Sequence, residues 1–315
     1  MEATVGELGE FALISAMTDR LPVGAHVLLG PGDDAAVVAA PDGRVVASTD
    51  VLVDGRHFRR AWSEAYDVGR RAAAANLSDI AAMGAVPTAL LVGLAAPGDL
   101  ATAWVLSLVD GVRDECEAAG ASVAGGDVVR SETLTVSVTA LGSLEGRDPV
   151  TRSGARPGDL VAVAGRLGWA AAGLAVLSRG FRSPRVLVDA HRRPAPPYSA
   201  GPGAAALGAS AMIDVSDGLV ADLGHLAVAS DVSVRLSSDA FHVPQEFLDT
   251  SRALNADPMA WLLAGGDDHA LAATFPPDVD LPMAWSVVGR VEEGEAGVLV
   301  DGEPYAGPGG WSAFD

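Results

Sequence analysis

The chain has 315 residues and a hydrophobic content of 49%, which is enough apolar sequence to fill the cores of two ordinary domains. Its formal charge is -20, so it would repel a phosphate backbone, and nucleic acid is excluded as a partner. All 21 basic residues are arginine, which excludes mechanisms built on a P-loop lysine, a protein-kinase strand lysine or a Schiff base.

The sequence predicts a cytoplasmic protein without a membrane partner. It has no run of about 18 uncharged apolar residues, and its first residues are acidic where a signal peptide would be basic. The one cysteine, Cys116, lies in a helix-like stretch, so neither an internal disulfide nor a multi-cysteine metal site is expected. We expect Cys116 to be buried or to lie on a helix face.

The first half is predicted to contain three helices separated by strands. Ser63 is a candidate N-cap for the middle helix, Gly84 is its C-terminal stop, and Pro87 lies just beyond. Small residues dominate and aromatics are only 5%, which favours closely packed α/β layers. The predicted elements are helices 7–20, 64–83 and 102–119 and strands 27–29, 36–39, 45–48, 88–96, 121–125 and 133–144.

Residues 146–158 concentrate glycine, proline and charge, which is the composition of a domain boundary. We predict one domain over residues 1–148 and a second over residues 149–315. The fold class is α/β (α+β), with an N-terminal mixed sheet and helices followed by a C-terminal α/β domain. In the second domain we predict strand 160–165, helix 169–180, a Pro/Arg-rich connection through 191–203, a strand feeding a helix over 209–230, a helix and turn over 257–270, and strands 269–275 and 285–291.

Several aspartates lie in apolar or glycine-rich surroundings instead of on charged faces. Three glycine–aspartate junctions stand at strand edges, in GPGDDAAVV, AGGDVVR and AGGDDHALAATF, and are candidates to converge. For any single one, an aspartate in a solvated turn is the simpler interpretation. The residues are Asp33, Asp34, Asp50, Asp79, Asp127, Asp214, Asp217, Asp267 and Asp268.

Asp79 is the hardest of these to explain by local structure. Helical spacing places Asn76 and Asp79 on one face amid alanines, in the last turns of a helix, where the macrodipole disfavours a carboxylate. A bound cation would account for it. The alternative is a carboxylate that accepts a hydrogen bond from a neighbouring loop.

Asp50 is predicted to end a strand, with the hydroxyl oxygens of Ser48 and Thr49 beside it. Oxygen-rich groups of this kind suit hard ions such as Mg²⁺, which bridge to phosphates. The alternative is an ordinary polar strand end.

In IDVSDGL, Ser216 is a candidate N-cap and Asp217 a favourable first-turn acid, so both have a structural explanation, which Asp214 lacks. Two unit charges 4 Å apart interact by about 4 kcal/mol at an effective dielectric of about 20. If these carboxylates converge, they therefore need cations or protons between them. Oxygen donors with few histidines indicate Mg²⁺ in place of zinc or copper.

The chain resembles the thiamine-monophosphate kinases, in the superfamily that also holds aminoimidazole ribonucleotide synthetase and selenophosphate synthetase. The motifs GEFALI, GDDAAV, STDVLVDGRHF, NLSDIAAMGA, AGGD, TRSGARPGD, IDVSDGL and GGDDHAL occur in the family's order and cover nearly the whole length. One such motif would be weak, whereas the ordered set is highly specific.

The resemblance implies direct phosphoryl transfer from ATP to thiamine monophosphate without a phosphoenzyme. It also implies two α/β domains and a homodimer in which N-terminal strands of both subunits form a barrel. No side chain would act covalently, and Asp50 and Asp127 would act through metal. By motif, the resemblance assigns several Mg²⁺ ions to Asp34, Ser48, Thr49, Asp50, Asp79, Asp127, Asp214 and Asp217, ATP to Gly126, Asp127, Arg152 and Ser216, and thiamine phosphate to His57, Asp267 and Trp311.

The chain departs from the family where GGEDYEL becomes GGDDHAL, which shortens the acid at Asp267 by one methylene. Each of three assigned residues has a simpler alternative. His57 could have a purely structural role, Arg152 could be a solvated arginine, and Trp311 could serve only in packing. The turn GRLG before WAAAGL is expected either to bind an anion or to pack tightly. Asp33 is either an outer ligand of the metal site or a turn acid.

Two other functions remain open at this stage. One is another ATP-dependent enzyme of the superfamily, similar to aminoimidazole ribonucleotide synthetase. The other is a non-catalytic protein that binds Mg²⁺ and nucleotide, which the altered GGDDHAL would favour.

Overall fold

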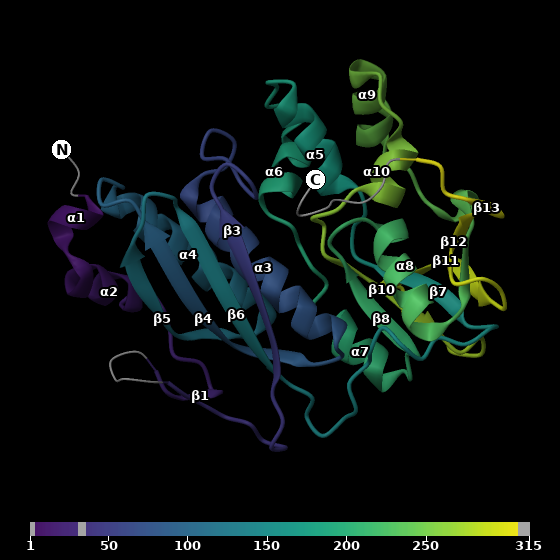
Figure 1. Ribbon diagram of the computed structural model, residues 1–315, viewed down its shortest axis with the longest axis horizontal. Helices are drawn as coiled ribbons and strands as arrows, with labels where there is room; N and C mark the ends of the chain where they lie inside the picture. The colour runs from purple at the N-terminus through teal and green to yellow at the C-terminus, as the bar shows by residue number, and fades with distance from the viewer. Residues whose placement is uncertain (1–3, 31–35, 308–315) are drawn as a thin grey trace. The chain divides into compact units, whose positions relative to one another are not determined.

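The computed structural model describes residues 4–30 and 36–307 and divides into two compact units (Figure 1). The first unit comprises Met1–Ile80 and Ala85–Gly146, and the second comprises Ala81–Gly84 and Arg147–Asp315. The division after Gly146 falls at the start of the glycine- and proline-rich segment. It differs from the predicted domains because Ala81–Gly84, at the end of a helix, belongs to the second unit.

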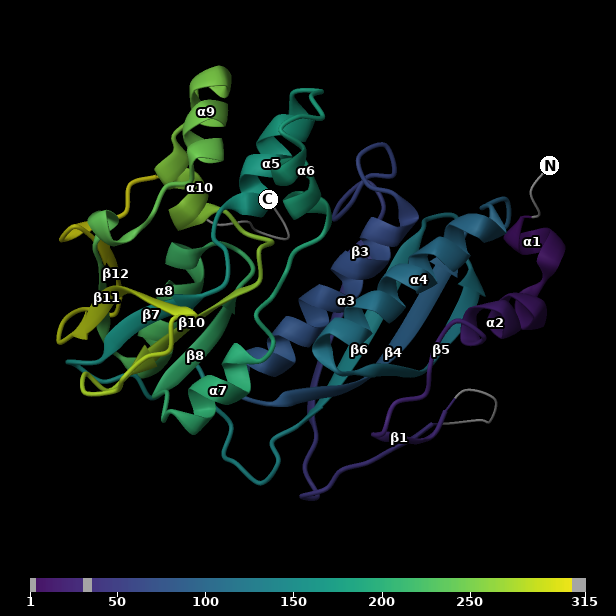
Figure 2. The same ribbon diagram turned by 180° about the vertical axis from the view of Figure 1, so that it is seen from behind.

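The first unit is a mixed sheet with two long helices on one face (Figures 1 and 2). Strand β3 pairs antiparallel with β6, β6 pairs antiparallel with β4, and β4 pairs parallel with β5. The parallel pair is connected through helix α4, as a parallel pair requires. In sheet order the strands are β3 (Val46–Val53), β6 (Thr135–Ser143), β4 (Val86–Ala96) and β5 (Ser122–Arg130), and the helices are α3 (Ala65–Ala82) and α4 (Thr102–Ala119).

Two glycines set the packing of α3 on α4. A Cβ atom at Gly69 would overlap the backbone oxygen of Leu108, and one at Gly111 would overlap the backbone oxygen of Tyr66. The helix backbones therefore contact each other directly, which larger residues would prevent. This contact fixes the helix face that α3 presents to the sheet.

Two predictions for the first unit need correction. The single leading helix is two helices, because the chain turns at Gly9 with φ 78°. The strand predicted over 45–48 continues to Val53, so Asp50 lies inside a strand and not at its end. The remaining elements are α1 (Val5–Leu8), α2 (Glu10–Thr18), β1 (Val27–Leu29) and β2 (Val37–Val38).

The second unit is built on a larger mixed sheet with helices packed around it (Figure 1). Its core gathers Val161, Ile213, Leu223, Val234 and Phe247, all fully or nearly buried. In sheet order the strands are β13 (Glu303–Pro304), β12 (Gly297–Val300), β9 (Ser233–Leu236), β11 (Trp285–Glu292), β7 (Leu160–Ala164), β10 (Ala270–Phe275) and β8 (Ala211–Val215). The helices are α5 (Trp169–Ser178), α6 (Arg185–Arg192), α7 (Ala200–Ala206), α8 (Leu219–Ser230), the 3-10 helix η1 (Ser238–Ala240), α9 (Gln245–Leu254) and α10 (Pro258–Ala264).

The segment predicted as a Pro/Arg-rich connection is wrong in part, because α6 ends inside it at Arg192 and α7 begins inside it at Ala200. Helix α6 is stabilised by a buried side, with Leu187 and Val188 almost inaccessible, and Pro184 precedes its first residue. Proline is compatible with a helix start, and arginine does not break a helix. In the part of the chain that the structure describes, no helix is both long and apolar enough to cross a membrane.

Candidate functional site

The first group of predicted site residues lies where β3 meets α3. The hydroxyl of Ser48 donates a hydrogen bond to Asp79 Oδ2 at 2.6 Å, and the backbone N–H of Asp50 donates to Asn76 Oδ1 at 2.9 Å. Side chains two apart on a strand share a face, so Ser48 and Asp50 both lie on the face that α3 covers. The predicted face of Asn76 and Asp79 thus lies against strand β3.

Asn76 is fully buried, and both the nitrogen and the oxygen of its side-chain amide form hydrogen bonds. Its amide nitrogen donates to the backbone oxygen of Ala72 at 3.0 Å, while its oxygen accepts from Asp50. This holds the β3 backbone at Asp50 against the helix. Asn76 was singled out from sequence only as a neighbour of Asp79; its role in positioning Asp50 follows from the fold.

Thr49 lies on the opposite face of the same strand. Its hydroxyl is 3.0 Å from the backbone oxygen of Val138 and 3.0 Å from Thr139 Oγ1. The structure therefore separates the side chain of Thr49 from those of Ser48 and Asp50, although the three are consecutive in sequence.

Gly126 and Asp127 lie on β5, at the other edge of the sheet. A Cβ atom at Gly126 would overlap the backbone oxygen of Val92, so only glycine fits this strand contact. Asp127 is exposed, and its Oδ1 accepts the backbone N–H of Val128 at 2.9 Å. Asp127 is in register with Gly93, Ser137 and Val51 and shares their face, which is not the face of Asp50.

Two strands separate Asp127 from Asp50 in the sheet order β3-β6-β4-β5. Three strand spacings of about 4.8 Å place these edges about 14 Å apart. The structure of one chain therefore does not bring the two carboxylates to a common ion. Among residues 4–30 and 36–307, no three His, Cys, Asp or Glu side chains are grouped so that they could hold a metal ion.

His57 lies in the turn that follows β3. The backbone N–H of Val53 donates to His57 Nδ1 at 3.1 Å. Because Nδ1 accepts, a neutral ring carries its proton on Nε2 and donates from that atom. The turn therefore fixes both the tautomer and the orientation of the imidazole.

In the second unit, the loop after β8 and the turn before β10 are joined by main-chain hydrogen bonds. The N–H of Asp267 donates to the backbone oxygen of Ser216 at 2.8 Å, and that of His269 donates to Val215 at 3.0 Å. Asp267 and His269 have φ values of 67° and 52°, in the left-handed region. The two motifs IDVSDGL and GGDDHAL therefore form one local structure.

Asp214 and His269 are buried beside each other, with His269 Nδ1 3.1 Å from Asp214 Oδ2. Asp214 is also in register with Leu271 of β10. His269 was noted in the sequence only as a departure from the family pattern. Its contact with a predicted metal ligand was not apparent from its position in the chain.

The predicted N-cap role of Ser216 is wrong, because α8 begins at Leu219 and its N-cap is Gly218. Asp222 Oδ2 accepts the backbone N–H groups of Ser216, Asp217 and Gly218, each at 3.0 Å. Gly218 is the N-cap of α8 and makes no side-chain cap. One buried carboxylate thus holds the backbone that carries Ser216 and Asp217.

Burial and neighbouring carboxylates raise the pKa values of two acids in this loop. Burial raises the pKa of Asp222 to about 7, and the charge of Asp214 adds to the effect. Burial, Asp214 and Asp267 likewise raise the pKa of Asp217. A cation beside them would relieve this repulsion, and carboxylate and hydroxyl oxygens suit Mg²⁺.

The helix start that follows the turn GRLG binds a carboxyl group of the chain itself. Asp268 Oδ1 accepts the backbone N–H of Ala170, in the first turn of α5, at 2.9 Å. Burial raises the pKa of Asp268 to about 7. The tight turn also brings Gly168, with φ 78°, against the backbone of Trp261.

Arg152 is the remaining predicted site residue that the structure describes. Arg152 is exposed, and its backbone oxygen accepts from Ser230 Oγ at 3.0 Å. Asp33, Asp34 and Trp311 lie outside the described residues.

The two units match the two domains of the AIR synthase related proteins. The model of the N-terminal domain of that family matches residues 32–144, and the model of its C-terminal domain matches residues 156–302. The hydrogenase maturation protein HypE, at 18% identity, has the same fold with a TM-score of 0.71 over 90% of this chain and 92% of its own.

Relatives with higher sequence identity are thiamine-monophosphate kinases. The thiamine-monophosphate kinase of Mycobacterium tuberculosis is 50% identical over 99% of this chain and 93% of its own length. That of Aquifex aeolicus is 36% identical over 98% and 99%. A structure described as AaThiL complexed with AMPPCP and TMP is 34% identical over 99% of each chain, with a TM-score of 0.81. The chain belongs to the thiamine-monophosphate kinase family.

Proposed function

We propose that the protein transfers the γ-phosphoryl group of ATP to thiamine monophosphate, giving thiamine diphosphate and ADP. The observation that carries the proposal is the 50% identity to a thiamine-monophosphate kinase over 99% of this chain. The relative solved with AMPPCP and TMP supports the pairing of an ATP-like nucleotide with this acceptor. The reaction would be the last step of thiamine diphosphate synthesis.

The proposed metal ligands form local groups in each unit. Ser48, Asp50 and Asp79 surround the contact of β3 with α3, and Asp127 stands on β5. Asp214 lies on β8 and Asp217 follows it, and burial, together with the charges of Asp214 and Asp267, raises the pKa of Asp217. Mg²⁺ ions, when bound, would neutralise the phosphate oxygens and polarise the transferred group. Asp34 and Thr49 complete the proposed set.

The chain's own residues would position the reactants. Gly126, Asp127, Arg152 and Ser216 are the proposed nucleotide contacts. His57 would donate from Nε2 to the thiamine phosphate, and Asp267 would contact the same substrate, with Trp311. Catalysis by positioning and charge neutralisation needs no side-chain nucleophile, which agrees with a chain that has no lysine.

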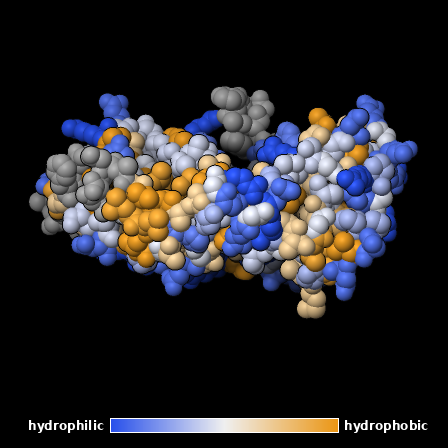
Figure 3. Space-filling view, turned by 90° about the horizontal axis from the view of Figure 1, so that it is seen from below, coloured by the Kyte–Doolittle hydropathy of each residue, from blue (hydrophilic) through white to orange (hydrophobic). Residues whose placement is uncertain are grey.

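A homodimer through the first unit is part of the proposal. One face of the sheet carries helices, whereas the other exposes Val51, Leu91 and Val129 at 47%, 38% and 50%. Both edge strands, β3 and β5, lack a further strand within the described chain. Apolar side chains also gather on the first unit in the view of Figure 3. A second copy would cover this face and pair its edges.

The test is to incubate the purified protein with Mg²⁺, ATP and thiamine monophosphate and to measure thiamine diphosphate as its fluorescent thiochrome derivative after chromatography. Thiamine in place of thiamine monophosphate is the matched control and should give no product. Nucleotide binding without thiamine diphosphate would instead support the non-catalytic function. The cytoplasmic location stays a prediction from the sequence.

A further inference from the structure

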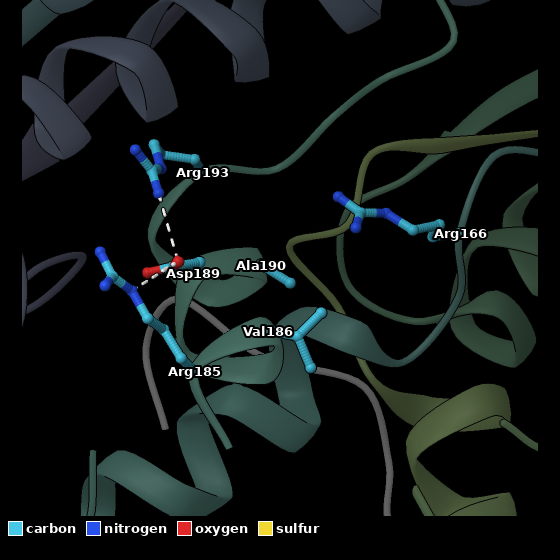
Figure 4. A pocket seen from close by; sticks show the side chains of 6 residues that line it. All are labelled: Arg166, Arg185, Val186, Asp189, Ala190 and Arg193. Carbon is cyan, nitrogen blue, oxygen red and sulfur yellow. Dashed lines mark hydrogen bonds and ion pairs between the residues drawn. The ribbon is translucent and has the colours of Figure 1, made fainter. Parts of the chain in front are cut away.

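A hollow of about 480 Å³ in the second unit lies beside α6 and the turn that precedes α5 (Figure 4). Helix α6 is fixed against α5 at Gly173, where a Cβ atom would overlap the backbone oxygen of Leu187. Leu187 and Val188 are buried on the packed side. This packing fixes the orientation of α6 about its own axis. It therefore determines which of its side chains reach the hollow.

Two neighbouring rows of α6 line one side. Arg185, Asp189 and Arg193 are spaced four residues apart and form the charged row, while Val186 and Ala190 form the apolar one. Asp189 Oδ2 lies 3.3 Å from Arg185 Nε and 3.5 Å from a terminal nitrogen of Arg193. The carboxylate of Asp189 thus forms an ion pair with each of the two arginines.

The ion pair with Asp189 uses only one of the nitrogens of Arg185. Among the described contacts, only Nε of Arg185 is engaged, and its side chain is 85% exposed. The guanidinium has five N–H donors in a planar fork, so its terminal nitrogens remain available to an anion. Val186, at 45% exposure, adds an apolar surface next to it.

Arg166, from the turn before α5, lines the other side of the hollow (Figure 4). Its guanidinium lies over the ring of Trp169, 5.4 Å from the centroid. Its charge also acts on the buried Asp268. Within the described part of the chain, no carboxylate lies at ion-pair distance from Arg166. The hollow is therefore flanked by arginines on two elements, in a protein whose formal charge is -20.

We propose that this arginine pocket, lined by Arg166, Arg185, Val186, Asp189, Ala190 and Arg193, binds the phosphate group of a small organic phosphate ester. Guanidinium forks suit phosphate oxygens, and the apolar row of α6 suits the organic part of the ester. The choice of a thiamine phosphate as that ester rests on the proposed function. The site itself rests on the arginines.

The experiment is calorimetric titration of the full-length protein, without Mg²⁺, with inorganic phosphate, thiamine monophosphate, thiamine and ADP. Phosphate and at least one phosphate ester should bind, and thiamine should not. Arg166→Gln and Arg185→Gln should each weaken that binding about tenfold, as expected for the loss of one charge-assisted contact. Arg252→Gln, at an arginine 73% exposed on α9, is the matched control and should bind as the wild type does.

The ligand arms identify the source of the phosphate. Arginine-dependent binding of thiamine monophosphate assigns the pocket to the acceptor, and arginine-dependent binding of ADP assigns it to the nucleotide. Equal affinity of wild type, Arg166→Gln and Arg185→Gln for every ligand would overturn the inference, even if thiamine diphosphate is formed. Conversely, arginine-dependent binding without product would leave the pocket standing and remove the proposed reaction.

Discussion

Asp222 is the residue on which the local structure after β8 depends most. It is 3% exposed and accepts three backbone N–H groups through one oxygen. The sequence motif IDVSDGL ends before it, so attention to the motif alone overlooks it. Its partners are backbone groups, which no pattern of side chains reveals.

Replacing Asp222 by alanine should leave those three buried donors without an acceptor. We expect the free energy of unfolding to fall by about 1–3 kcal/mol, measured by urea denaturation at pH 6, where repulsion from a charged carboxylate is reduced. Asp222→Asn keeps an oxygen and should lose less. An alanine variant as stable as the wild type would show that these hydrogen bonds do not hold the loop.

Asp268 gives the metal-free protein a pH dependence of stability. Its folded pKa is raised to about 7 from 3.8, so the folded state retains a proton that the unfolded state has lost. The contribution of this group therefore makes the free energy of unfolding fall as pH rises from about 4 to about 7. Asp268→Asn still offers an oxygen to Ala170 and should flatten that slope in denaturation curves. An unchanged slope would contradict the assignment.

At the scale of elements, periodic segments were predictable and contact-dependent ones were not. The amphipathic helix over 102–119 and strand over 27–29 are confirmed with their bounds. Helix α6 was missed because its arginines and the flanking Pro184 and Pro194 resemble a loop, and only its buried side distinguishes it. The metal-, nucleotide- and substrate-binding roles that the family resemblance assigns by motif stay predictions. The opposite faces of Ser48 and Thr49 follow from the alternation of side chains once the strand continues to Val53. The pairing of His269 with Asp214 was not predicted, because it depends on how a strand and a turn meet in space.

The direct contact of α3 with α4 should depend on glycine. Gly69→Ala should lower the free energy of unfolding by about 1–3 kcal/mol, because its methyl group would overlap the backbone of Leu108. At Gly224, inside α8, a Cβ atom would have no neighbouring atom within 4 Å. Gly224→Ala is therefore the matched control and should stabilise by about 0.5–1 kcal/mol. Equal effects of the two substitutions, compared in urea, would refute the packing argument.

At the scale of the whole molecule, the exposed apolar side chains of the first sheet, Val51, Leu91 and Val129, predict a dimer. Val129 is 50% exposed on the edge strand β5, so Val129→Asp should place a charge in the interface and shift the protein to a monomer. Val228 is 68% exposed on α8, in the second unit, and Val228→Asp should remain dimeric. Sedimentation velocity distinguishes the states. A wild type that is monomeric at every concentration would exclude this interface.

The most direct test of the proposed activity follows the phosphoryl group itself. The protein is mixed with Mg²⁺, thiamine monophosphate and ATP labelled with ³²P at the γ position, and small molecules and protein are separated within one turnover. Direct transfer predicts label in thiamine diphosphate and none on the protein, since the mechanism uses no side-chain nucleophile. Label held by the protein, or ATP consumed with no labelled thiamine diphosphate, would contradict the account.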